Sequence, residues 1–206
     1  MKAFWDRSFG NPMSLHLYGD ESRLAVEEAR KKVADLIHVD PKEVIFVSCG
    51  TEANNMAIKG IASAYAQKRG RHIITSMVEH PSVLLSCKSL EKQGFQVTYL
   101  PVDRYGRIDP NEVGRSITSE TVLISIMWAN NEIGTIQPIR EIARLAHEHG
   151  AVFHTDAIAA VGRIPVDLER VEVDALSLSA DQFYGPPGVS ALFLRRGIRM
   201  APLLEG

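Results

Sequence analysis

The sequence has 206 residues and a mass of 22.8 kDa, a length that favours one good-sized domain. Its 23 basic and 25 acidic residues give a formal net charge of −2 without a basic block, which argues against nucleic acid as the primary partner. Hydrophobic residues make up 45% of the chain, too many for a disordered protein. No apolar run approaches the roughly 18 residues that span a bilayer, and the first residues do not resemble a signal peptide. We therefore expect a cytoplasmic protein without a membrane partner.

Lysine and cysteine are unusually placed. Every lysine lies at or before Lys92, so the rest of the chain contains none. The two cysteines, Cys49 and Cys87, are too few for a disulfide framework, and their neighbours lack the Cys/His set of a structural zinc site. We expect no metal site.

The predicted elements alternate between helix and strand. Apolar residues at helical spacing predict a first helix that Asp20 caps and that ends at Ile37. Further helices are predicted at 53–68, 81–93, 110–117 and 138–149. Strands are predicted at 44–47, 73–75, 97–100, 122–127, 152–155, 175–178 and 190–194, with a turn at 103–106 and a polar loop at 130–137.

This alternation predicts an α/β fold built from βαβ units. Its sheet is mostly parallel, with helices on both faces. No linker or repeat divides the chain, so we expect one domain over residues 1–206, with 1–20 as an N-terminal segment and 200–206 as a strand exit cut short. Such sheets bind ligands beyond the carboxyl ends of their strands, which directs attention to the polar residues there.

The small residues between the first strand and the next helix suggest an anion site. In this turn, residues 48–52, the unpaired N–H groups of the helix and its dipole favour a phosphate, and the Thr51 hydroxyl adds a donor. The alternative is a helix N-cap without a ligand.

Three other strand exits carry polar side chains. His80 could stack on a flat ring or move protons, or be structural, and the amides of Asn130 and Asn131 suit either a ligand oxygen or a turn. Asp156 follows a buried strand and needs positive charge nearby. A protonated ring nitrogen and an arginine would each supply it.

Six segments of the sequence, in order and spacing, resemble the cysteine desulfurases, a group of the class V aminotransferase family of pyridoxal-phosphate enzymes. They are residues 9–12, 48–55, 79–80, 129–134, 156–157 and 179–186. The resemblance implies the large domain of a fold-type I enzyme, a three-layer sandwich around a mainly parallel seven-stranded sheet. The reaction it implies is sulfur removal from L-cysteine, giving alanine and a persulfide for iron–sulfur cluster or thiocofactor assembly.

The resemblance also implies roles for the residues at the strand exits. Gly50, Thr51 and Ser179 would bind the cofactor phosphate. His80 would stack on the ring and shuttle protons, and Asn131 would bond the ring hydroxyl oxygen. Asp156 would pair with the ring nitrogen, which makes the ring an electron sink. The two lines of reasoning agree on these residues, and the resemblance implies that the cofactor is pyridoxal 5′-phosphate.

The sequence departs from the family pattern around this pocket. Gln182 stands at the position of the lysine that forms the Schiff base, and an amide nitrogen cannot do so because its lone pair is delocalised. Asp181 replaces the neighbouring histidine, Ala159 replaces a glutamine that binds the ring oxygen, and Pro187 replaces a second lysine. We therefore expect cofactor binding that is at best non-covalent.

The family pattern also extends beyond both ends of this sequence. Relatives carry the persulfide cysteine and an arginine for the substrate carboxylate in a small C-terminal domain. Neither Cys49 nor Cys87 matches that cysteine, and we interpret both as small apolar residues.

Three hypotheses about function follow. The first is a degenerate desulfurase-like protein that is inactive alone, because Gln182 cannot form the covalent bond. The second is an interaction partner of an active desulfurase or of an iron–sulfur scaffold protein, and the third is one half of a split enzyme. In each case we expect a homodimer, or a heteromer with a desulfurase-type subunit.

Overall fold

The computed structural model describes residues 4, 6 and 9–205. It divides into two compact units, residues 1–44 and 45–206, which are taken separately below. Part of the predicted N-terminal segment therefore lies outside the described residues.

Helix α2 (Leu17–Ile37) dominates the first unit. It begins earlier than predicted, because the N-cap is His16, whose Nδ1 accepts a hydrogen bond from the backbone N–H of Gly19. The prediction that Asp20 caps this helix was wrong. Asp20 lies in the first turn and pairs with Arg23 at 2.6 Å instead. The 3-10 helix η1 (Pro41–Glu43) follows, with the Asp40 side chain as its cap.

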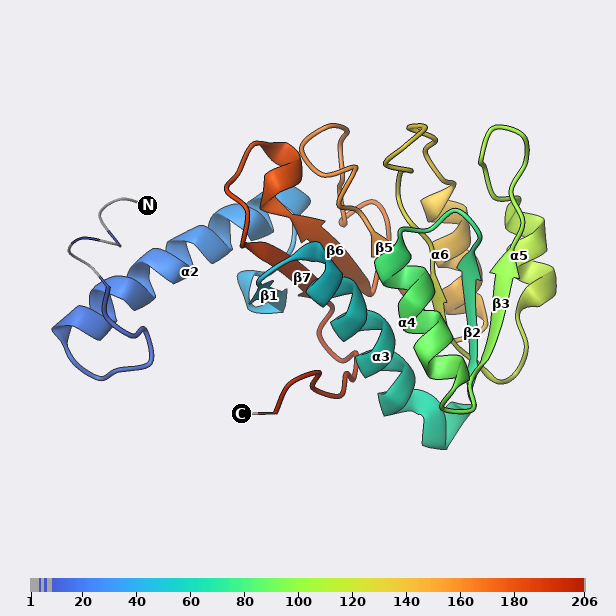
Figure 1. The fold of residues 1–206 in the computed structure, drawn as a ribbon, viewed down its shortest axis with the longest axis horizontal. Helices are drawn as coiled ribbons and strands as arrows, with labels where there is room; N and C mark the ends of the chain where they lie inside the picture. Colours follow the sequence, from blue (N-terminus) through green and yellow to red (C-terminus); the bar gives the residue numbers. More distant parts are fainter. Residues whose placement is uncertain (1–3, 5, 7–8, 206) are drawn as a thin grey trace. The chain divides into compact units, whose positions relative to one another are not determined.

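The second unit is built on a seven-stranded sheet, whose first strand starts at the unit boundary (Figure 1). In space the strands follow the order β1-β7-β6-β5-β4-β2-β3. The registered pairs are parallel except for β6 with β7, which is antiparallel. The strands are β1 (Val44–Val47), β2 (His72–Ser76), β3 (Gln96–Leu100), β4 (Thr121–Ser125), β5 (Val152–Asp156), β6 (Ala175–Ser179) and β7 (Ser190–Leu194).

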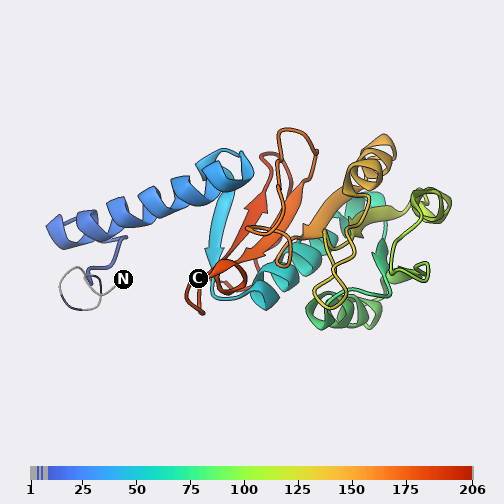
Figure 2. The ribbon, with the colours of Figure 1, turned by 90° about the horizontal axis from the view of Figure 1, so that it is seen from above.

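Helices cover both faces of this sheet and make it a three-layer sandwich. Helices α3 (Gly50–Arg69) and α4 (Pro81–Glu91) lie on one face, and α5 (Pro110–Ser116) and α6 (Ile139–Glu148) on the other (Figure 2). A 3-10 helix, η2 (Ala180–Phe183), follows β6. The predicted α/β architecture with a mainly parallel sheet is confirmed.

The core explains why the strand prediction succeeded. Every residue of β2, β4, β5 and β6 is buried, as expected for strands covered on both faces. Helix α3 packs its apolar side against them, and Ala57, Ile58 and Ile61 are fully buried there. Each buried isoleucine contributes about 2 kcal/mol to the free energy of folding.

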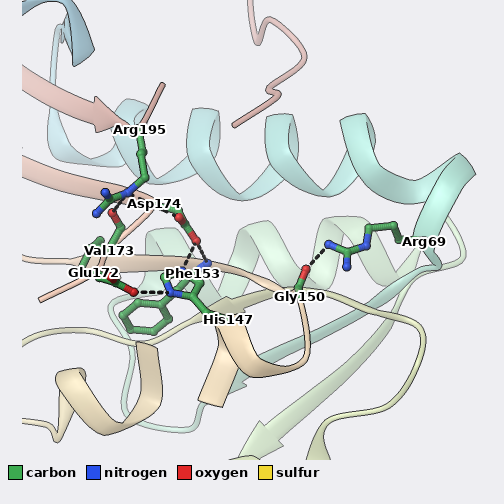
Figure 3. A network of polar contacts seen from close by, with 8 residues as sticks. All are labelled: Arg69, His147, Gly150, Phe153, Glu172, Val173, Asp174 and Arg195. Atoms are coloured by element: carbon green, nitrogen blue, oxygen red, sulfur yellow. Dashed lines mark hydrogen bonds and ion pairs between the residues drawn. The ribbon is translucent and has the colours of Figure 1, made fainter. Parts of the chain in front are cut away.

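One polar network fastens three elements at the opposite ends of these strands (Figure 3). The buried Asp174 carboxylate accepts 2.8 Å hydrogen bonds from the backbone N–H of Phe153 in β5 and from Nε2 of His147 in α6. Arg195, just after β7, lies 3.7 Å from the same carboxylate. The hydrogen bond to Asp174 raises the pKa of His147, and Glu172 adds to this effect.

After β7 the chain runs back along α3. The backbone N–H of Ala201 donates to the carbonyl of Gly60 at 3.0 Å, and any Cβ at Gly60 would stand 2.6 Å from the Ala201 oxygen. The described part of segment 200–206 contains no helix or strand. Among the described residues, no helix has both the length and the apolar character needed to cross a membrane.

Candidate functional site

A cavity of about 300 Å³ lies where the strands end, in the second unit. The strands that end there are β1, β2, β4, β5 and β6, because parallel strands bring their carboxyl ends to one edge. All seven residues predicted from the sequence line it: Gly50, Thr51, His80, Asn131, Asp156, Ser179 and Gln182. Also in its lining are Cys49, Ser82, Met127, Ala129, Ile158, Ala159 and Asp181.

The N-terminus of α3 forms one end of the cavity. The N-cap residue Cys49 makes no side-chain capping bond, so the small-residue turn does not satisfy the first N–H groups in the usual way. A Cβ at Gly50 would stand 2.3 Å from Cδ1 of Ile158 and 3.7 Å from Cβ of Ser179. A side chain at Gly50 would displace the end of the Ile158 side chain, and Ser179 lies next to the helix N-terminus.

Asp156 lies at the other end of the cavity and is buried. Its carboxylate accepts hydrogen bonds from Nδ2 of Asn54 at 2.7 Å and from the backbone N–H of Ile158 at 3.0 Å. Burial raises the pKa of Asp156, against the effect of these two donors. No lysine or arginine of the described chain lines the cavity, which leaves room for a cationic group of a ligand beside this carboxylate.

A chain of hydrogen bonds joins Asp156 to His80. Asn54 Nδ2 also donates to Oγ of Ser82 at 2.9 Å, and Ser82 Oγ lies 2.7 Å from Nδ1 of His80. The backbone N–H of Ser82 donates to the same Nδ1 at 3.1 Å, which makes Nδ1 an acceptor. The proton of a neutral His80 is therefore on Nε2.

Sequence reasoning missed Asn54 and Ser82. Asn54 could have been found from its position, because it is a polar residue on the apolar side of α3, beside Ala53 and Ala57. A buried amide there needs hydrogen-bond partners. Ser82 has no comparable signal, because a serine one residue after a helix-opening proline is ordinary.

The cavity lining also contains Asp181 and Gln182, two of the four residues that depart from the family pattern. Asp181 is exposed and Gln182 is half-buried, both in η2. Ser179 Oγ donates a hydrogen bond to one carboxylate oxygen of Asp181, and Gln182 Nε2 donates to the other at 3.1 Å. The bond from Ser179 keeps the pKa of Asp181 below its usual value, so this group is a carboxylate at neutral pH.

The cysteines differ from each other. Cys87 is buried, and burial raises the pKa of its thiol to about 12. Cys49 is exposed and lines the cavity, so its interpretation as a small apolar residue was wrong. Its place at the N-cap of α3 explains the exposure.

Within residues 4, 6 and 9–205, no group of three or more His, Cys, Asp or Glu side chains is arranged to hold a metal ion.

Glu79 is buried next to the cavity, between β2 and β4. Its Oε1 accepts hydrogen bonds from Ser76 Oγ at 2.7 Å and from the backbone N–H of Met127 at 2.9 Å. Its Oε2 is buried without a hydrogen-bond partner. Burial raises the pKa of Glu79 to about 8, so the folded protein keeps this carboxyl protonated at pH 7.

We predict that Glu79→Gln removes a large part of the pH dependence of stability. The unfolded chain loses the Glu79 proton near the ordinary glutamate pKa of 4.5, whereas the folded chain holds it to about 8. The free energy of unfolding of the wild type therefore falls as pH rises between these values. Between pH 5 and pH 7, the free energy of unfolding of the wild type should fall by about 2 to 3 kcal/mol more than that of Glu79→Gln. Urea unfolding at the two pH values measures the difference. Glu141→Gln, an exposed control on α6, should follow the wild type. Parallel pH profiles for wild type and Glu79→Gln would contradict this assignment.

Polar side chains from five strand ends, gathered around one cavity of a mainly parallel sheet, define a cofactor-binding α/β domain. The chain belongs to the aminotransferase class-V family, which it matches over residues 1–206. Enzymes of this family and the cysteine desulfurases in it depend on pyridoxal phosphate.

Individual relatives agree with this assignment. The chain is 54% identical over its whole length to "Cysteine desulfurase IscS" of Dictyoglomus turgidum and 51% identical to the protein of the same name of Methanosarcina thermophila. It covers 52% and 51% of those proteins, so it spans about half the length of the curated relatives it matches. A solved "NifS-like protein" superimposes on the whole chain with a TM-score of 0.96 at 40% identity, with 56% of that protein covered.

The cavity fits pyridoxal phosphate at its ring end. A protonated ring nitrogen would supply the positive charge that the buried Asp156 carboxylate lacks, and His80 and Asn131 line the same space. At the phosphate end, Gly50 and the α3 N-terminus fit an anion, but the Asp181 carboxylate beside Ser179 does not. The fit is therefore good for the ring and incomplete for the phosphate.

Proposed function

We propose that this chain is a pyridoxal-phosphate-binding domain of a cysteine desulfurase-like protein that holds its cofactor without a covalent bond and does not desulfurate L-cysteine by itself. The observation that carries the proposal is that Gln182, which the sequence pattern aligns with the family's lysine, lines the cavity. The family match and the seven predicted residues that line the cavity support the cofactor.

In this proposal each residue acts through the atoms described above. Asp156, held by Asn54 and the Ile158 N–H, would pair with the ring nitrogen of the bound cofactor and stabilise its protonated form. The His80 imidazole, whose Nδ1 accepts the Ser82 N–H, would stack on the ring. Asn131, which lines the same cavity, would donate to the ring oxygen. When bound, the cofactor supplies an electron sink for substrate carbanions.

Gln182 explains the loss of covalent attachment. Its amide nitrogen is not nucleophilic, and its side chain is already engaged, with Nε2 on Asp181 and Oε1 3.4 Å from Arg163. No lysine follows Lys92 in the sequence, and none of the described lysines lines the cavity. Cofactor affinity would then rest on hydrogen bonds and the Asp156 charge alone.

Two measurements on the purified chain test the proposal. Calorimetric titration with pyridoxal phosphate measures the affinity, and desalting of the loaded protein shows whether the cofactor is retained. We expect one site of micromolar or weaker affinity, full loss of the cofactor on desalting, and no alanine formed from L-cysteine with the cofactor in excess. Cofactor that survives desalting, or alanine production above that of free pyridoxal phosphate, would contradict it.

We also propose that the first unit takes part in assembly with a second copy or a desulfurase-type subunit. It presents several large apolar side chains to solvent: Phe9, Met13, Leu15, Leu17, Tyr18 and Leu24. Exposed apolar side chains gathered on one short unit are typical of interaction surfaces. The cytoplasmic location and a role with an iron–sulfur scaffold protein stay predictions.

A further inference from the structure

The phosphate end of the cavity already contains an anion that belongs to the chain. Ser179, which is buried, gives its one hydroxyl proton to Oδ1 of Asp181. Its second neighbour, Ser190 Oγ at 2.7 Å, must then be a donor to Ser179. Ser179 is left without a proton to offer to a phosphate oxygen.

Asp181 is held in this place from both sides. While Ser179 binds Oδ1, Gln182 Nε2 binds Oδ2 at 3.1 Å. Gln182 is itself fixed by Arg163, whose guanidinium nitrogen lies 3.3 Å from its backbone carbonyl and 3.4 Å from its Oε1. Asp181 and Gln182, two of the residues that depart from the family pattern, thus bind each other, and Asp181 also binds the serine at the phosphate end.

The charge of the cavity opposes a phosphate as well. The lining contains two carboxylates, Asp156 and Asp181, and His80 is its only basic side chain among the described residues. Ser179, the serine that Asp181 holds, is next to Gly50 at the α3 N-terminus, the one feature that attracts an anion there. A phosphate dianion bound at this end would lie beside a fixed negative charge, and no lysine or arginine is among the described residues that line the cavity.

We propose that Asp181 acts as an internal substitute for the cofactor phosphate and makes the cavity select against phosphorylated ligands, so that it accepts the unphosphorylated pyridoxine ring at least as well. This inference rests on the proposed cofactor site and specifies which form of the ligand the site takes. It identifies Asp181 as the specificity-determining residue.

Binding of pyridoxine and of pyridoxine 5′-phosphate, compared by calorimetry, tests the inference. Neither compound carries an aldehyde, so neither can attach to lysines elsewhere on the chain. The wild type should bind pyridoxine as tightly as its phosphate or tighter. Asp181→Asn removes the charge, and Asp181→Ala removes the charge and frees the Ser179 proton. Both variants should tighten binding of pyridoxine 5′-phosphate by about 10-fold or more, with pyridoxine changed less than about 2-fold.

The controls separate this inference from the function on which it rests. Glu169→Gln removes one exposed carboxylate outside the cavity lining and should leave the ratio of the two affinities unchanged. If both compounds bind and the ratio is the same in wild type and both Asp181 variants, the inference is wrong while the cofactor site stands. If neither compound binds any of these proteins at millimolar concentration, the proposed function fails together with the inference. Circular dichroism confirms that the variants are folded.

Discussion

Gln182→Lys should give the chain the covalent cofactor bond that we propose the wild type cannot form. The new side chain would start from η2, in the cavity wall, where Gln182 now lies among the lining residues. An unprotonated lysine amine condenses with the aldehyde of pyridoxal phosphate, whereas the Gln182 amide cannot. We expect a new absorption band at the edge of the visible range that persists after desalting, and that borohydride converts into a permanent adduct at position 182.

A matched variant shows whether the position matters. Gln93→Lys adds the same group at an exposed site just beyond the C-terminal end of α4. This site is at the opposite end of the helix from the cavity-lining Ser82, which lies in its first turn. The Gln93→Lys variant should therefore give no persistent band. Asp181 would pair with the new amine and hold it protonated, so the double variant Asp181→His with Gln182→Lys should load more completely. If Gln182→Lys, alone and in the double variant, behaves like Gln93→Lys, position 182 does not face the cofactor and the site assignment fails.

Asp174→Ala should cost the second unit about 3 kcal/mol of unfolding free energy. Asp174 is 5% exposed and accepts hydrogen bonds from the Phe153 N–H and from His147, which ties β5 to α6. Removing it leaves a buried backbone N–H without an acceptor and takes the counter-charge from Arg195. Urea unfolding followed by circular dichroism at pH 6 measures the loss.

Glu172→Ala is the control for this network, because Glu172 also approaches His147 but its side chain is 79% exposed. Exposed ion pairs contribute little, so its loss should cost less than about 1 kcal/mol. Equal effects of the two substitutions would show that burial of Asp174 does not determine its contribution.

The strands were predictable from sequence because both faces of this sheet are covered. A strand buried on both sides is a short apolar run with no alternation, and Val122, Leu123 and Ile124 of β4 show this. Helix ends were less predictable. The sequence does not show which side chain reaches the first N–H groups of α2. In the structure His16 accepts the hydrogen bond there, and Asp20 pairs with Arg23.

The cavity residues were predictable to the extent that they follow strands. His80, Asn131 and Asp156 each lie just beyond a strand or at its last residue, and a parallel sheet brings such positions together. The role of Asn54 was not predictable, because its contact with Asp156 joins a helix to a strand end 102 residues away. The hydrogen bond from Ser179 to Asp181 was also not predictable, because it depends on the conformation of η2 and not on the spacing of the residues in the sequence.

The intact mass of the wild-type chain after incubation with pyridoxal phosphate and reduction with borohydride tests the central claim most directly. The cavity offers the aldehyde an amide at Gln182 and no lysine among its lining residues. We expect the mass of the unmodified chain at stoichiometric cofactor, under conditions in which Gln182→Lys gains one adduct. A single stoichiometric adduct on the wild type, mapped by peptide digestion to one lysine, would contradict the claim that this chain holds its cofactor without a covalent bond.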